Sequence, residues 1–292
     1  MLWPNHSQLT KIRAMKALFD QVSTECSKNT TKLYSTSFSM ATALLNKRFR
    51  DPIYQIYGFV RFADEIVDTF HEYDKKDLLD RFWADTHRAI EEKISLNPIL
   101  NSLQAVYHNY DFDMDLIDDF MKSMAMDLED HVYDRSNFET YIYGSAEVVG
   151  LMCLKVFTER NKELYDRLTP HARSLGSAFQ KVNFLRDLQA DYEHLGRTYF
   201  PGVSFEHFSA EEKGRIEDEI AKEFQHAYEG IIQLPKSARF GVYLAYIYYQ
   251  RLFSKIKKTS AQQIKHERIR ISNPRKYSLL VGSYVKHQLN LF

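Results

Sequence analysis

The chain has little of what disulfide-rich and zinc-binding domains depend on. Its 292 residues include two cysteines, Cys26 and Cys153, with ten glycines and seven prolines. The cysteines lie far apart and form no metal-binding spacing, so we expect reduced thiols. The histidines lack an HExxH or other paired spacing, so no zinc site is expected from His6, His71, His87, His171, His226 and His266. No Gly-, Pro- or Ser-rich stretch indicates a linker, which predicts one domain spanning residues 1–292.

Long apolar runs and an excess of charge of either sign are also missing. No stretch of about 18 uncharged apolar residues exists, so no transmembrane helix is expected. The N-terminal residues lack the pattern of an export signal, and we expect a cytoplasmic protein. The 39 basic and 39 acidic residues cancel, which argues against nucleic-acid binding. The basic stretch Lys255–Arg270 is either a solvated surface or a weak peripheral contact with anionic lipid.

What the sequence does contain is helical periodicity along most of its length. Apolar residues recur three and four positions apart, and sustained alternation is absent. Pro52 and Pro98 suit first-turn positions, with Asp51 and Asn97 before them as N-caps. The pattern predicts an all-α fold with helices at about 11–29, 35–46, 52–70, 76–95, 98–110, 113–130, 137–158, 161–190, 209–232, 236–258 and 275–290.

Aromatic residues are dense, with 19 Tyr, 20 Phe and 2 Trp. They cluster in residues 54–62, 141–143 and 243–253. Large side chains of this kind fill the cores of long helices. They also suit the walls of an apolar tunnel, where aromatic faces can stabilise a carbocation. Both interpretations remain open from the sequence.

The helix predicted at 52–70 carries an unusual polar stripe. Tyr57, Arg61, Asp64 and Asp68 recur at spacings of four, three and four, so they share one face of a helix. The rest of the segment is largely apolar, and buried carboxylates require compensating cations. Two carboxylates one turn apart can share Mg²⁺ and leave room for water and phosphate. A solvated acidic face is the alternative.

A second segment repeats the arrangement and favours the metal interpretation. Gln180, Asn183, Asp187 and Asp191 lie on one face of the helix predicted at 161–190 or just beyond it. Apolar residues surround this face as well. Two helices of this kind can hold a cluster of hard cations with a diphosphate between them.

These two segments resemble the squalene/phytoene synthase family, the head-to-head trans-isoprenyl diphosphate synthases. The first motif is residues 57–68, and the second is residues 180–191 followed by Gly196–Pro201. The resemblance extends from about Tyr34 to Tyr277. It implies a single isoprenoid synthase domain, a helical bundle around a central apolar cavity.

The resemblance also implies roles for individual residues. It implies metal ligands at Asp64, Asp68, Asn183, Asp187 and Asp191. The four aspartates among them are also implied to be catalytic. It implies diphosphate or substrate contacts at Tyr57, Arg61, Gln180, Arg186 and Tyr248, and in the segment Tyr34, Ser35, Thr36 and Ser37. It implies a catalytic tyrosine near the reacting carbons at Tyr141.

Two of these segments depart from the family's pattern. Tyr34 stands where a histidine is common, and Thr36 stands where a lysine or arginine is common. In the segment 141–150, Ser145 replaces a usual valine and Glu147 replaces a usual glycine. Asp127 is a further candidate for a supporting role near the cavity. Glu65 points away from Asp64 and is expected to serve the surface rather than a metal.

The implied reaction joins two geranylgeranyl diphosphates head to head, through prephytoene diphosphate, to give phytoene for carotenoid biosynthesis. It implies Mg²⁺ as cofactor, with Mn²⁺ as a substitute, and no NADPH. Dehydrosqualene or squalene synthesis from two farnesyl diphosphates is the alternative. A non-catalytic scaffold of the same fold is a remote one, because such relatives typically lose the aspartates that are retained here.

Overall fold

The computed structural model describes residues 6–129, 134–195, 199–203, 205–266 and 269. Within these ranges every element is helical, as the sequence predicts. The first half of the chain forms α1 (His6–Tyr34), α2 (Thr36–Ala43), α3 (Lys47–Thr69), α4 (Lys75–Glu92), α5 (Pro98–Tyr110) and α6 (Met114–Met126). The second half forms α7 (Arg135–Ile142), the π-helix η1 (Tyr143–Glu147), α8 (Val148–Thr158), α9 (Lys162–Leu195), α10 (Ala210–Ile231), α11 (Lys236–Lys258) and α12 (Ala261–Ile264).

Most predicted helices exist, and two have the predicted bounds, those at 98–110 and 236–258. Pro98 is at the start of α5, where the side chain of Asn97 accepts a hydrogen bond from the Ile99 amide at 3.0 Å. The assignment of Pro52 to a first turn with Asp51 as N-cap is wrong. Helix α3 begins earlier because Asn46 caps it, accepting from the Arg48 amide at 3.2 Å. Pro52 therefore lies inside the helix.

Two further features of the helices differ from the prediction. The single helix predicted at 137–158 is divided by η1, a wider turn that is common at functional sites and that periodicity does not predict. The short helix α12 was not predicted. The helix expected at 275–290 lies outside the described residues.

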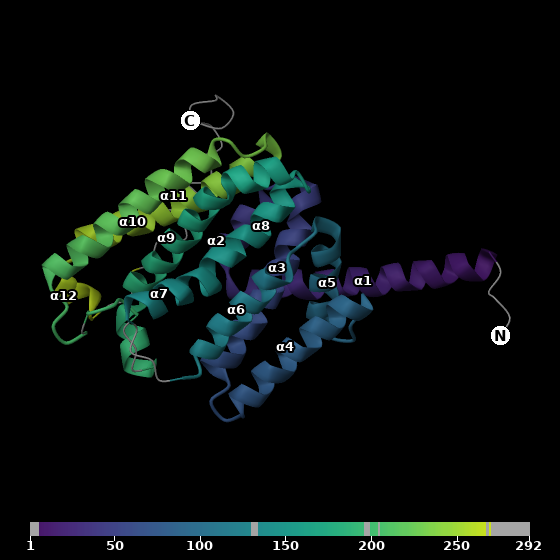
Figure 1. The fold of residues 1–292 in the computed structure, drawn as a ribbon, viewed down its shortest axis with the longest axis horizontal. Helices are drawn as coiled ribbons and strands as arrows, with labels where there is room; N and C mark the ends of the chain where they lie inside the picture. The colour runs from purple at the N-terminus through teal and green to yellow at the C-terminus, as the bar shows by residue number, and fades with distance from the viewer. Residues whose placement is uncertain (1–5, 130–133, 196–198, 204, 267–268, 270–292) are drawn as a thin grey trace.

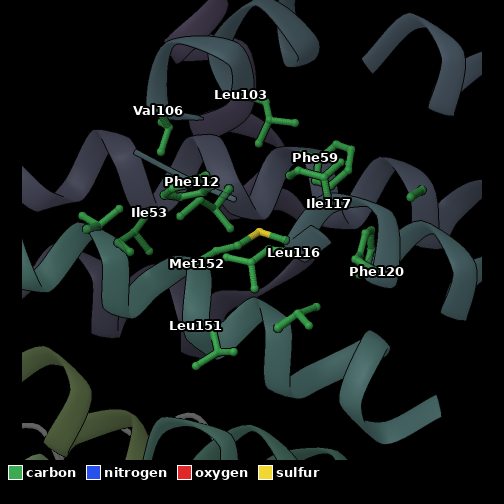
Figure 2. Close-up of a cluster of buried hydrophobic side chains, with 14 of the residues drawn as sticks. Ile53, Phe59, Leu103, Val106, Phe112, Leu116, Ile117, Phe120, Leu151 and Met152 are labelled. Carbon is green, nitrogen blue, oxygen red and sulfur yellow. The ribbon is translucent and has the colours of Figure 1, made fainter. Parts of the chain in front are cut away.

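Two hydrophobic clusters hold the bundle together. The larger one joins α3, α4, α5, α6 and α8, with Phe59, Ile117 and Met152 at its centre (Figure 2). The second joins α7, α9, α10, α11 and α12 through residues such as Phe184 and Ile220. Helix α1 packs along α3 and α5, and its N-terminal part projects from the body of the molecule (Figure 1). Among the described residues, no helix has the length and apolar character needed to span a membrane.

Candidate active site

An apolar cavity lies beside the larger cluster, which contributes Ile53, Ile56 and Leu154 to its walls, as the resemblance implies. The volume of this cavity is about 290 Å³. Helices α2, α3, α8, α9, α10 and α11 contribute its walls, which are almost entirely hydrocarbon. Tyr57 of α3 and Gln180 of α9 are among its few polar lining residues. On both helices the aspartates follow these two residues, so each acidic segment begins where the cavity wall ends.

The acidic stripe of α3 forms a charged cluster at this point. Arg61 donates to Asp64 through one terminal nitrogen and to Glu65 through the other. The buried Nε of Arg61 has no hydrogen-bond partner among the described residues. Glu65 is only 16% exposed and shares Arg61 with Asp64, so its expected place at the surface is wrong, and its exclusion from the metal set stays a prediction. Asp68 is exposed one turn further on, close enough to Asp64 to interact electrostatically.

The environment of Asp64 disfavours an isolated carboxylate. Its side chain keeps 36% of its accessible surface, but protein atoms crowd the carboxylate on its other sides. This loss of hydration and the nearby Asp68 raise the pKa of Asp64 to about 7, although Arg61 acts in the opposite direction. A cation between the two carboxylates would favour the charged form of both. The oxygen-rich donor set therefore fits a hard divalent cation.

The second acidic segment lies on α9. Arg186 donates to Asp187 through Nε at 3.0 Å and through a terminal nitrogen, and both side chains are about four-fifths buried. The amide of Asn183 lies 3.4 Å from the side-chain oxygen of Gln180. The backbone of Asp191 belongs to α9, but its side chain lies outside the described part of the structure. Its role as a metal ligand therefore stays a prediction.

Tyr249 of α11 connects the two motifs. The sequence pattern does not identify it as a site residue. Its hydroxyl donates to Oδ1 of Asn183 at 3.3 Å, and its ring stacks on Phe179 at 3.8 Å. It also lies close enough to Tyr57 to affect the pKa of that residue. Burial raises the pKa of Tyr249 itself. The only signal in the sequence was its place beside Tyr248 in an aromatic segment, which does not distinguish the two.

The segment after α1 lies against the same end of α3. The guanidinium of Arg61 lies 4.4 Å from the centre of the Tyr34 ring, a cation–π contact. Ser35 caps α2 and forms a hydrogen bond with Tyr57. Tyr34 stands where the family often has a histidine, and here its ring contacts the guanidinium of Arg61.

A second, smaller cavity of about 130 Å³ brings three more of the predicted substrate contacts together. Ser35, Ser37 and Tyr248 all line it. Thr36 is exposed and lines neither of the two cavities. Of the four-residue segment 34–37, Thr36 is thus the member with the least structural connection to the site.

Tyr141 lies apart from the apolar cavity. Only 3% of its surface is exposed, and its hydroxyl donates to Oδ2 of the buried Asp127 at 2.9 Å. Its ring stacks against Tyr199 at 5.5 Å. Asp127 and Tyr141 are partners and line neither of the two cavities, so a supporting role of Asp127 near the cavity stays a prediction. The catalytic role of Tyr141 remains a prediction.

Replacing Tyr141 by phenylalanine is expected to lower the free energy of unfolding by about 1–3 kcal/mol, because the buried Asp127 loses a donor. Denaturant unfolding of the two proteins measures this. Equal midpoints would contradict a structural role for the bond. The kcat of the same variant, compared at a temperature where both proteins are folded, reports any direct part in the reaction.

The departures in the segment 141–150 have clear structural positions. Glu147 pairs with Nε of Arg173 at 2.5 Å, and Arg173 in turn lies over the Tyr143 ring. The charge of Glu147 is thus compensated between η1 and α9 and does not line the cavity. Ser145 does line it, with a buried hydroxyl oxygen that has no hydrogen-bond partner in the part of the chain that the structure describes.

Comparison with known proteins agrees with the all-helical fold. The family model for squalene/phytoene synthase matches residues 31–275. The chain is similar to the 15-cis-phytoene synthase of Paracoccus sp. (28% identity, 84% of this chain and 86% of the relative) and to that of Pantoea ananas (25%, 85% and 87%). In fold it is similar to a dehydrosqualene synthase crystallised with ligand, with a TM-score of 0.80, 23% identity, and coverage of 94% and 98%. The chain belongs to the squalene/phytoene synthase family of prenyltransferases.

Proposed function

We propose that the protein joins two molecules of geranylgeranyl diphosphate head to head, through prephytoene diphosphate, to form phytoene. One observation carries the proposal: two acidic helices line a single apolar cavity and continue into their aspartates beyond it. The cavity suits a long hydrocarbon chain, and the charged cluster suits its diphosphate. Relatives named 15-cis-phytoene synthase support the choice of product.

The proposed metal is Mg²⁺, for which Mn²⁺ can substitute. Asp64, Asp68, Asn183, Asp187 and Asp191 would hold it. When bound, the metal neutralises the negative charge that develops on the departing diphosphate. The crowding of Asp64 and its closeness to Asp68 support this assignment, because a cation between the two carboxylates would favour the charged form of both.

The cationic side chains bind and orient the substrate. Arg61 and Arg186 are each held by a neighbouring carboxylate, so their guanidinium planes are fixed before a diphosphate arrives. Tyr57 and Gln180 lie between the charged cluster and the cavity, where they can contact the first carbons of the chain.

The apolar walls govern the carbon chemistry. Departure of diphosphate leaves an allylic cation, which the C2–C3 double bond of the second substrate attacks. The attack leaves a tertiary cation, which closes to a cyclopropylcarbinyl diphosphate as the former C1 of the first substrate loses a proton. This diphosphate ionises in turn, rearranges to the 1–1′ coupled chain and loses a second proton. Water would quench these cations, so its exclusion by the cavity is essential. Aromatic faces such as that of Phe179 can stabilise positive charge inside it.

Condensation of two farnesyl diphosphates is the second candidate, because the fold neighbour with a TM-score of 0.80 is a dehydrosqualene synthase. Incubation of the purified protein with C15 or C20 diphosphate and Mg²⁺, with and without NADPH, distinguishes the two. Mass analysis of the lipid extract should detect a C40 hydrocarbon from the C20 substrate that does not depend on NADPH. A C30 product alone would show that the protein condenses two farnesyl diphosphates and does not make phytoene. Release of no diphosphate from either substrate would indicate a non-catalytic scaffold.

Tyr249→Phe tests the supporting contact to Asn183. Loss of the hydroxyl leaves a proposed metal ligand less firmly oriented, so the Mg²⁺ concentration for half-maximal activity should rise about tenfold. Tyr246→Phe is the matched control, since its hydroxyl accepts from Gln250 on the same helix and lines neither cavity. Equal Mg²⁺ dependence in both variants would remove Asn183 from the metal set.

A further inference from the structure

A second group of metal-ligating side chains lies away from the aspartates. It consists of His171 on α9 and His226 and Glu229 on α10, and one potential ligand atom of each lies within 4.8 Å of the others. His171 also lines the apolar cavity. Sixteen residues separate His171 from Asp187 along α9, about 24 Å at 1.5 Å per residue. The group is therefore distinct from the diphosphate site.

Hydrogen bonds orient both imidazole rings. Nδ1 of His171 lies 2.8 Å from the backbone oxygen of His226, so this nitrogen carries the proton. Nδ1 of His226 lies 2.8 Å from Oγ of Ser174, which can accept its proton. Each ring then has Nε2 with a lone pair as its remaining nitrogen. This is the usual arrangement of histidine ligands, whose other nitrogen is held by a carbonyl or similar acceptor.

Packing fixes the rings as well. The two ring centres are 4.3 Å apart. A Cβ atom added to Gly230 would lie 2.3 Å from Cβ of His171, a distance that real atoms do not reach. Glycine inside a helix costs about 1 kcal/mol relative to alanine. The close approach of His171 gives a structural reason for glycine at this position of α10.

The donor set points to a different metal from that of the aspartates. Two imidazole nitrogens and one carboxylate are a common set for Zn²⁺, which leaves a fourth position for water, whereas Mg²⁺ prefers oxygen ligands alone. In a tetrahedral site with bonds of about 2.1 Å, ligand atoms lie about 3.4 Å apart. Glu229 is exposed, so its side chain has room to turn toward the two imidazole rings.

We propose that His171, His226 and Glu229 form a zinc site that links α9 to α10 beside the cavity wall. From the sequence we expected no zinc site at these histidines, because His171 and His226 are 55 positions apart and meet only through helix packing. A metal that binds only the folded protein stabilises the folded state. The gain in stability increases with the logarithm of the ratio of metal concentration to Kd. Zn²⁺ should therefore raise the Tm.

The test is a calorimetric titration of the whole protein with Zn²⁺ in excess Mg²⁺, which occupies the oxygen-rich site. One equivalent should bind. Ser174→Ala should weaken binding about 10- to 100-fold through loss of ring orientation, and His226→Gln and Glu229→Gln should weaken it more. His71→Gln, at an exposed histidine of another region, is the control and should bind like the wild type.

Co²⁺ gives a second readout that depends on geometry. A tetrahedral site with nitrogen ligands produces an intense visible absorption, which an octahedral oxygen site does not. The band should be present in the wild-type protein and His71→Gln and absent from Glu229→Gln, whose exposed position makes misfolding no concern. Absence of stoichiometric Zn²⁺ binding in the wild type, or a band that persists in Glu229→Gln, would overturn the proposal.

Discussion

Asp64→Asn is expected to lower kcat about 100- to 1,000-fold, the usual loss when one group that stabilises developing charge is removed. In the absence of metal, the same variant should have an equal or higher Tm. Asp64 is crowded by protein atoms and lies beside Asp68, so its negative charge opposes folding, and a neutral amide of the same size removes this repulsion. Steady-state kinetics and thermal unfolding measure the two effects.

The sign of the stability effect follows from the raised pKa of Asp64. An acid whose pKa is about 7 in the folded protein, against 3.8 for the ordinary group, binds its proton more tightly when folded. Its contribution favours folding below about pH 4 and is lost as the pH rises through 7. The gain in Tm from Asp64→Asn should therefore be larger at pH 8 than at pH 5.

Asp80→Asn is the matched control for this experiment. Asp80 also lies on a helix in an i, i+4 pair, with Lys76, but both side chains are largely exposed. Such pairs contribute little, so neither kcat nor Tm should change appreciably. If Asp64→Asn and Asp80→Asn had the same activity, Asp64 would have no part in the metal site.

Cys153→Phe is expected to change which chain length the protein accepts. Cys153 lines the cavity one turn of α8 before Phe157, which packs against Phe49 at the start of α3, far from the aspartates. Overfilling a packed apolar space costs about 1–3 kcal/mol. The C20 chain must occupy that space, whereas the C15 chain need not reach it. The ratio of kcat/KM for C20 over C15 diphosphate should fall about 10- to 100-fold.

Two further variants separate chain length from general damage. Cys153→Ala enlarges the cavity and should keep the preference for the C20 substrate. Ala84→Phe introduces the same ring at an exposed position of α4 and should leave the ratio unchanged. If Cys153→Phe reduced both kcat/KM values equally, the cavity would not be the site of the hydrocarbon chain.

The sequence was informative wherever one helix contains the whole pattern. The helix at 98–110 carries its own start signals, Asn97 and Pro98, and was predicted with its bounds. The stripes of Tyr57 to Asp68 and Gln180 to Asp191 each lie on one helix, so spacing alone places their members on one face. The family resemblance then indicated that the two faces serve one site.

Contacts between different helices could not be predicted from spacing along the sequence. The hydrogen bond from Tyr249 to Asn183 joins residues 66 positions apart, and the ion pair of Arg173 with Glu147 joins residues 26 apart. Both depend on how α9 packs against its neighbours. The π-helix η1 is a local feature, but its apolar spacing also suits an ordinary helix. Asn46 as N-cap was overlooked because Pro52 gave a stronger local signal.

The central claim is that both acidic helices hold one diphosphate at the end of the apolar cavity. A crystal structure with Mg²⁺ and a thiolo analogue of geranylgeranyl diphosphate tests it most directly, because the analogue binds without ionising. We expect metal ions contacted by Asp64 and by Asp187, with the hydrocarbon chain along the cavity past Tyr57 and Gln180. Metal ions contacted by one helix alone, or a chain outside the cavity, would contradict it.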